Sequence, residues 1–166
     1  MTEVVAASED AEGVRWRLSI AAVDEDGPFS HYPGIDRVIV VLEGEGMVLD
    51  HDGAAASVTV LPGQPYRFSG DWQTRCRLLA GPVRDWNLMV RRGLYEAEVV
   101  VRGPGPAVPP EGLVVLHPIR AGLLAGTLRC EHGETLIIDP SEHRPRFQID
   151  GQGVALQVVF RPTSPD

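Results

Sequence analysis

The stretch EGEGMVLDHDG, residues 43–53, continues after a short gap as VTVLPGQPYRFSG, residues 58–70. Short apolar runs alternate here with Gly, Pro and acidic residues. Asp52-Gly53 and Pro62-Gly63 are dipeptides typical of tight turns. Apolar runs this short have the length of strands rather than of helices. The stretch therefore predicts a meander of short β-strands.

The same pattern of short apolar runs separated by Gly and Pro extends along the whole chain, which contains 18 Gly and 14 Pro among 166 residues. Around the opening stretch, 15–21 alternates between apolar and polar residues, whereas 36–42 is β-branched and apolar, as in a strand buried on both faces. A short helix over 91–98 is one alternative, but Val99-Val100-Val101 favours a strand. The predicted strands are 15–21, 36–42, 46–50, 57–61, 66–68, 75–80, 83–91, 113–118, 123–130, 134–138, 146–149 and 154–161.

Composition and charge limit the classes of function. The apolar fraction of 43% suffices for a hydrophobic core, and the net charge of −8 argues against nucleic acids and anionic membrane surfaces as partners. No run approaches the roughly 20 apolar residues of a membrane span. The acidic N-terminal segment lacks the pattern of a signal peptide. Two distant cysteines, Cys76 and Cys130, do not form a disulfide framework, so we expect a cytoplasmic protein.

The segment 103–111 begins GPGPAVPP, which predicts a stiff linker without strand or helix. We therefore expect a first half at 1–102 and a second half at 112–166, packed as a single compact unit. The two halves resemble each other. Residues 46–53 align with 126–133, and 59–70 align with 136–151, which suggests two half-barrels built alike.

Several motifs between Trp16 and Gly93 resemble those of the HutD/Ves family of bicupin-like proteins. They are, in order, WRLSIA, DGPFSHYPGIDR, LEGEGMVLDHDG, PYRFSGDW and GPVRDWNLMVRRG. The resemblance implies an all-β fold with little helix, a double cupin-like (bicupin) β-barrel or jelly-roll sandwich whose second half is a degenerate copy. It also implies an association with histidine utilisation, in which such proteins are thought to bind a small intermediate and modulate the flux.

The histidine spacing argues against a metal site. Metal-binding cupins use His-x-His, because alternate residues of a strand point to the same side. No pair of histidines here has that spacing. An alternative ligand set is Cys130, His132 and Glu134, with His143 downstream. The interpretation favoured here is an exposed turn at His132 and a buried filler at Cys130, so we expect no metal and no cofactor.

No catalytic signature is apparent. The sequence contains no G-x-S-x-G elbow, phosphate-binding loop or dinucleotide fingerprint. Ser30 and His31 are adjacent and would point to opposite sides of a strand. Asp36 and Asp71 lie at turns, where carboxylates more often cap backbone N–H groups.

The segment 83–91 is unusually polar for a core strand. By alternation, Asp85 and Asn87 share one face, and Trp86 and Leu88 lie on the other. If both faces of the strand are covered, the side chains of the polar face need hydrogen-bond partners inside the protein. A bound ligand is one possible partner. Arg37 opens an apolar strand and offers a planar fork suited to a carboxylate. The predicted ligand-binding residues are Arg37, Asn87, Ser30, Ser19, Asp85 and Arg17.

For each of these residues a purely structural role is also open. Arg37 can pair with an acidic neighbour and tie a loop to the barrel rim, and Arg84, Arg91 and Arg92 can be solvated or bridged. Taken as a cluster together with the family resemblance, the residues favour a pocket for a small anionic metabolite, urocanate or a formylated glutamate derivative.

Three functions are compatible with this pattern. The first is a non-catalytic ligand-binding protein that modulates histidine degradation. The second is a metal-independent isomerase or hydrolase acting on the same intermediates, with Asp85 or His31 as base. The third is an interaction module without a small ligand. A homodimer formed through edge strands is also compatible with the pattern.

Overall fold

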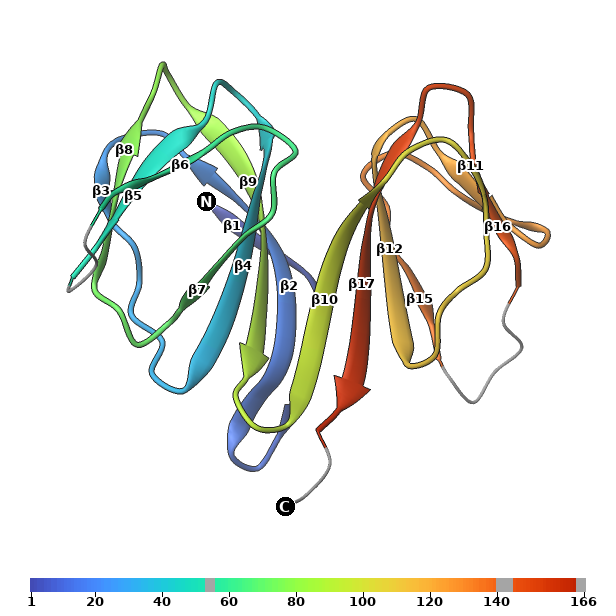
Figure 1. Ribbon diagram of the computed structural model, residues 1–166, viewed down its shortest axis with the longest axis horizontal. Coiled ribbons are helices and arrows are strands. Elements are labelled where there is room, and N and C mark those ends of the chain that lie inside the picture. Colours follow the sequence, from blue (N-terminus) through green and yellow to red (C-terminus); the bar gives the residue numbers. More distant parts are fainter. Residues whose placement is uncertain (53–55, 140–144, 164–166) are drawn as a thin grey trace. The chain divides into compact units, whose positions relative to one another are not determined.

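The computed structural model describes residues 1–52, 56–139 and 145–163, and in these ranges every helix or strand is a β-strand (Figure 1). The all-β fold class is therefore confirmed. Within these ranges there is no helix with the length and apolar character to cross a membrane. The chain divides into two compact units, Met1–Leu94 and Tyr95–Asp166.

The first unit consists of two antiparallel sheets. One has the strand order β1-β2-β9-β4-β7 and the other β3-β8-β5-β6. The strands are β1 (Thr2–Asp10), β2 (Gly13–Val23), β3 (Gly27–Pro28), β4 (Ile35–Glu43), β5 (Met47–His51), β6 (Val58–Val60), β7 (Tyr66–Ser69), β8 (Thr74–Leu78) and β9 (Val83–Arg91).

The second unit also has two sheets, with the orders β10-β17-β12-β15 and β11-β16-β13-β14. Its strands are β10 (Tyr95–Arg102), β11 (Gly105–Ala107), β12 (Leu113–Arg120), β13 (Leu123–Ala125), β14 (Leu128–Cys130), β15 (Leu136–Ile138), β16 (Phe147–Ile149) and β17 (Val154–Pro162).

The two units share one topology. Each strand from β2 to β9 has its counterpart eight strands later, and both sheets keep the same order of neighbours. The predicted repeat is therefore present, but the predicted alignment was one strand out of step. It matched β5 with the segment that contains β14, whereas the counterpart of β5 is β13. Successive hairpins carry similar Gly-containing and acidic turns, so local sequence does not distinguish one hairpin from the next.

The connection between the units differs from the predicted linker. β10 pairs along its length with β17, so 95–102 belongs to the second unit, and the strand favoured over the alternative helix at 91–98 is present. Within 103–111, β11 pairs with β16, although this segment was expected to contain no strand. Pro106 is accommodated because β11 is an edge strand of its sheet, where a missing N–H donor is tolerated.

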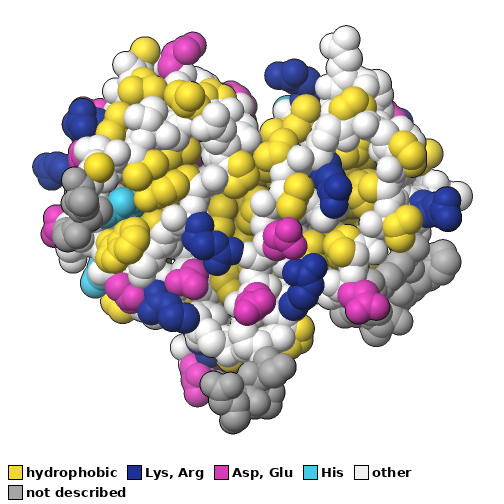
Figure 2. Space-filling view, viewed as in Figure 1, with side chains coloured by type: hydrophobic (Ala, Val, Ile, Leu, Met, Phe, Trp, Pro, Cys, Tyr) yellow, Lys and Arg dark blue, Asp and Glu magenta, His cyan; other side chains and the backbone are white. Residues whose placement is uncertain are grey.

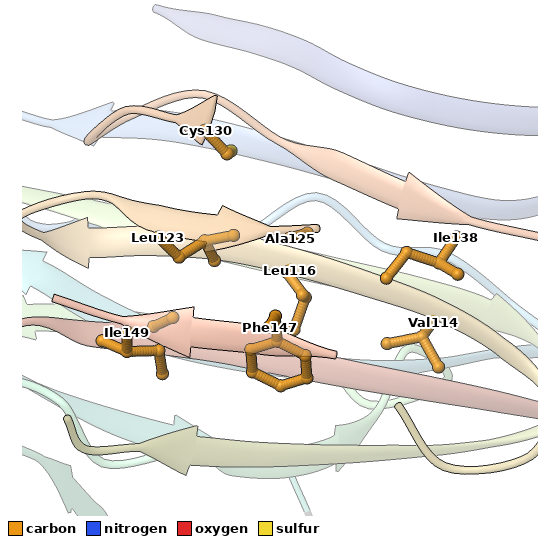
Figure 3. Packing of buried hydrophobic residues seen from close by; sticks show 9 residues of the cluster. Val114, Leu116, Leu123, Ala125, Cys130, Ile138, Phe147 and Ile149 are labelled. Atoms are coloured by element: carbon orange, nitrogen blue, oxygen red, sulfur yellow. The ribbon is translucent and has the colours of Figure 1, made fainter. Parts of the chain in front are cut away.

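Each unit has its own apolar core between its two sheets. In the second unit, Val114 and Leu116 of one sheet face Leu123, Phe147 and Ile149 of the other, and the cluster is nearly free of solvent contact (Figure 3). In the first unit, Ile39, Val41 and Phe68 pack against Met47, Leu49 and Cys76. The burial of these faces fixes which side of each strand points inward.

Arginine side chains on the surface lie beside acidic ones (Figure 2). The three arginines left open by the sequence as solvated or bridged are all bridged. Arg84 bonds to Glu43 at 2.8 Å, Arg91 to Asp10 at 2.7 Å and Arg92 to Asp71 at 2.7 Å. These three arginines therefore form ion pairs at the surface of the first unit.

Gly70 provides a test of how the 29–35 loop is held. Its N–H donates to the carbonyl oxygen of Ile35 at 2.7 Å, and its own carbonyl accepts from Tyr32. A Cβ atom at this position would collide with the Tyr32 carbonyl oxygen and lie 2.7 Å from that of Ile35. We expect Gly70→Ala to lower the free energy of unfolding by about 1–3 kcal/mol, measured by urea denaturation, because backbone atoms have to move.

The matched control is Gly27→Ala in the same unit, where an added Cβ meets nothing within 4 Å. This variant should stay within about 0.5 kcal/mol of the wild type. Equal effects of the two substitutions would contradict the proposed close approach.

Candidate functional site

The first unit contains a cavity of about 470 Å³. All six residues predicted from the sequence line it: Arg17, Ser19, Ser30, Arg37, Asp85 and Asn87. The remaining lining includes Phe29, Tyr32, Cys76 and Met89, together with the acidic segment 24–26. The structure thus gathers the predicted cluster around one space.

Strand alternation and register explain this gathering. Three neighbouring strands, β2, β9 and β4, present polar side chains on the face that points toward the second sheet. Met89 of β9 pairs with Arg17 on one side and Arg37 on the other. Asn87 lies two residues before Met89 on the same face of β9, and it pairs with Ser19 and Ile39. Directly paired side chains on one sheet face lie about 5 Å apart, so the two guanidinium groups flank Met89.

Arg37 is buried, with 5% of its surface exposed. Its Nη2 donates to Asn87 Oδ1 at 2.7 Å, and its Nη1 donates to the carbonyl oxygen of Ser30 at 3.4 Å. The guanidinium carbon lies 4.8 Å from the ring centre of Phe68 and 5.4 Å from that of Phe29. Burial lowers the pKa of Arg37 to about 10, which leaves the side chain charged at neutral pH.

Asp85 is more completely buried, with 1% exposed. Its Oδ1 accepts a hydrogen bond from Asn87 Nδ2. Burial raises the pKa of Asp85 to about 7, while Arg37 and the bond from Asn87 act in the opposite direction. Asn87 therefore bridges a cation and a carboxyl group, with its amide oxygen toward Arg37 and its nitrogen toward Asp85.

Arg17 lies beside the aromatic part of the cavity. Its Nη2 donates to Tyr32 Oη at 3.3 Å and contacts Met89 Sδ at 3.0 Å. The hydrogen bond from Arg17 is the main cause that lowers the pKa of Tyr32. The carbon of the Arg17 guanidinium lies 5.5 Å from the centre of the Tyr32 ring, as does that of Arg37.

Three buried atoms of the cavity-lining residues have no hydrogen-bond partner within the described part of the chain. They are Arg17 Nε, Arg37 Nε and Asp85 Oδ2. Unpartnered buried polar atoms are rare because each carries a desolvation penalty. The residues that line the cavity therefore keep two donors and one acceptor unpaired.

Sequence reasoning missed part of the cavity. Ser30 contributes its carbonyl oxygen to Arg37, and its side chain hydrogen-bonds to Tyr32. The aromatic contacts of Arg37 with Phe29, Tyr32 and Phe68 were not predicted. The segment PFSHYPG, residues 28–34, contained a signal for two of these contacts, because two aromatic residues flank a predicted pocket serine.

The rim loop is held by Asp71. Its Oδ1 accepts from the Gly34 N–H at 2.7 Å, and its Oδ2 accepts from Ser69 Oγ at 2.8 Å. The Gly34 bond, with help from Ser69 and Arg92, lowers the pKa of Asp71 to about 2. The predicted capping role of Asp71 is confirmed. His31 contacts the Asp71 carbonyl oxygen on the exposed side, and it is not among the residues that line the cavity.

The alternative metal set is not assembled. β14 ends at Cys130, which is buried in the apolar core, and His132 lies exposed in the following turn. Cys130, His132 and Glu134 therefore do not share a strand face as that alternative required. His143 lies outside the described residues. In the described ranges no group of three or more His, Cys, Asp or Glu side chains could hold a metal ion.

Comparison with known proteins places the chain in a family context. The family model described as HutD matches residues 1–157. An uncharacterised 21.2 kDa protein from the hutC 3′ region of Pseudomonas putida is 44% identical over 91 residues, which are 55% of this chain and 47% of that protein. The chain thus spans about half the length of this curated relative.

Solved structures extend the comparison. HutD from Pseudomonas fluorescens, in a structure described as the formate condition, is 32% identical with a TM-score of 0.83, covering 96% of this chain and 88% of that one. A conserved protein of unknown function from Pseudomonas aeruginosa is 27% identical with a TM-score of 0.85, covering 98% and 91%. A cupin 2 conserved barrel domain protein from Leptotrichia buccalis is 8% identical with a TM-score of 0.63, covering 97% and 88%. This last likeness shows the fold alone and supports the cupin-like architecture.

The raised pKa of Asp85 predicts a pH-dependent cost in stability. An unfolded Asp ionises near pH 3.8, whereas the folded group keeps its proton until about pH 7. Between these values the folded state binds the extra proton, so the wild type loses stability as the pH rises and levels off above 7. Asp85→Asn cannot ionise, so it should gain up to about 4 kcal/mol relative to the wild type between pH 4 and pH 8, measured by urea denaturation.

Asp71→Asn is the control with the opposite sign. Its folded pKa is depressed to about 2, so the wild type gains stability from this group as the pH rises through 4. This variant should therefore be less stable than the wild type at pH 7 and approach it near pH 2. A difference between Asp85→Asn and the wild type that does not change with pH would show that Asp85 is ionised throughout.

Proposed function

The chain belongs to the HutD family, and from that premise we propose that it is a cytoplasmic protein that binds a small carboxylate metabolite of histidine utilisation and thereby modulates the pathway without catalysing a reaction. The candidate ligands are urocanate and formylated glutamate derivatives. The family is associated with the histidine utilisation locus, and the curated relative lies beside hutC.

One observation carries the proposal. Two guanidinium groups, of Arg17 and Arg37, flank Met89 on the inner face of one sheet, and each keeps an unpartnered Nε. Burial is the main cause that lowers the pKa of Arg37, and repulsion from the like charge of Arg17 adds to it. A carboxylate between them would relieve this repulsion and accept hydrogen bonds from planar donors that suit its geometry. Such an anion site explains why two cations are kept inside a sandwich.

The size and lining of the cavity fit a small metabolite. Its volume of about 470 Å³ lies within the range of small-molecule sites. Aromatic rings of Phe29 and Tyr32 lie beside the guanidinium of Arg37 and can pack against a planar ligand. The combination of apolar walls with a few converging polar groups is typical of a binding site.

A second candidate function rests on Asp85. A buried carboxyl group with a pKa of about 7 has the property expected of a general acid or base at neutral pH. The alternative is therefore a metal-independent isomerase or hydrolase acting on the same intermediates. Incubation of each candidate ligand with the protein, followed by chromatography for product, separates this function from binding alone.

Calorimetric titration with urocanate, formiminoglutamate and formylglutamate tests the binding proposal. We expect at least one to bind the wild type and Arg37→Met to weaken that binding by about 10- to 100-fold, since a charge-assisted hydrogen bond contributes about 1.5–3 kcal/mol. Arg37→Lys keeps the positive charge but loses the planar pair of N–H donors, so its affinity should lie between those of the wild type and Arg37→Met. The control is Arg84→Met, an exposed arginine of β9 that bonds to Glu43.

Arg84→Met should bind within about twofold of the wild type, because rim charges contribute little to affinity. The proposal fails if none of the three compounds binds the wild type. It also fails if Arg37→Met and Arg37→Lys, both folded by circular dichroism, bind as tightly as Arg84→Met.

A further inference from the structure

When ionised, Asp85 repels a plain carboxylate, yet it lies in the same cavity as the two arginines. A buried carboxyl group close to an anion site weakens anion binding through repulsion. A second cation or a neutral polar residue would serve a simple carboxylate better. Its presence therefore points to a second group on the ligand.

The hydrogen bonds within the cavity leave one oxygen of Asp85 unused. Oδ1 accepts from Asn87 Nδ2, and the orientation of that amide is fixed because its Oδ1 accepts from Arg37. Oδ2 has no partner among the described residues. The nearby thiol of Cys76 contacts Met47 Sδ at 3.6 Å and is not bonded to Asp85. No donor of the described residues therefore competes for this oxygen.

The charges at the cavity edge agree with such a ligand. Asp24, Glu25 and Asp26 are exposed and line the same cavity. Three carboxylates at this position repel a ligand that carries only negative charge, whereas they attract one that also has a polarised or cationic N–H group. The inner arginines and the outer carboxylates therefore favour a molecule with two unlike ends.

We propose that Asp85 Oδ2 accepts a hydrogen bond from a nitrogen of the ligand, so that the cavity selects carboxylates that also carry an imidazole or amidine N–H over plain carboxylates. The ligand carboxylate lies between Arg17 and Arg37, and its N–H group lies at Asp85. This inference rests on the proposed function, because it assumes that a carboxylate occupies the arginine pair.

Matched ligand pairs test the inference by calorimetry at pH 8, where Asp85 is largely ionised. The first pair is trans-urocanate and trans-cinnamate, which share the propenoate group but differ in the imidazole. The second is formiminoglutamate and glutarate, of which only the first has an amidine. In at least one pair the nitrogen compound should bind the wild type at least about tenfold more tightly, a difference of about 1.4 kcal/mol.

Asp85→Asn should reduce this ratio to below about threefold, mainly through weaker binding of the nitrogen compound, because a donor –NH₂ replaces the free acceptor. The control Glu45→Gln removes the same charge from an exposed residue that does not line the cavity, and it should leave the ratio within about twofold of the wild type. Circular dichroism establishes that both variants are folded.

The outcomes separate the two proposals. If no compound of either pair binds the wild type, the anion site itself is wrong, and the role of Asp85 falls with it. If the members of each pair bind the wild type equally, the anion site stands and the role of Asp85 is wrong. The same conclusion follows if the preference is unchanged in Asp85→Asn. The wild-type comparison decides the question even if a variant does not fold.

Discussion

The first unit depends on a chain of hydrogen bonds inside a β-sandwich, from Arg37 through the amide of Asn87 to Asp85. A guanidinium and a carboxyl group can be kept away from water only if each finds a partner. An amide is suited to join them because it carries both an acceptor and two donors. The bridge fixes the orientation of Asn87, and it leaves Arg37 Nε and Asp85 Oδ2 available to the cavity. These two unpaired atoms are the groups on which the proposed ligand contacts depend.

The comparison of the two units shows that buried charge is not a requirement of the fold, because the described residues of the second unit include buried Gln157 and His117 but no buried arginine or carboxylate. Both units have the same strand order, but the space between the sheets of the second is filled by residues such as Leu116, Leu123 and Phe147 (Figure 3). The first unit uses the same framework and places charged side chains on three neighbouring strands. Buried charge lowers stability relative to apolar packing. The buried charge of the first unit therefore has a cost in stability that the second unit avoids.

The sequence predicted which polar residues line the cavity better than it predicted the details of the fold. Alternation along 83–91 placed Asp85 and Asn87 on one face of the strand. Because both faces of β9 are buried, this polar face lies in the interior. The alignment of the repeat failed by one strand, because hairpin turns resemble one another. β11 was not predicted because a proline, Pro106, argues against a strand, although an edge strand tolerates it. The contact of Arg37 with Phe68 was missed because the two residues meet only through the pairing of β4 with β7.

The one strand without a counterpart gives a further reason to place the site in the first unit. β1 pairs with β2 and turns it from an edge strand into an inner strand, whereas the equivalent β10 lies at the edge of its sheet. Arg91 stabilises the β1–β2 hairpin by donating hydrogen bonds to the carboxylates of Asp10 and Glu12 and to the carbonyl oxygens of Gly13 and Val14. A strand that is hydrogen-bonded on both sides holds its side chains in place more firmly than an edge strand does. β2 carries Arg17 and Ser19. The additional strand therefore supports the part of the cavity wall that keeps the Arg17 guanidinium in position, for which the described residues supply Tyr32 and Met89 as contacts and no acidic partner.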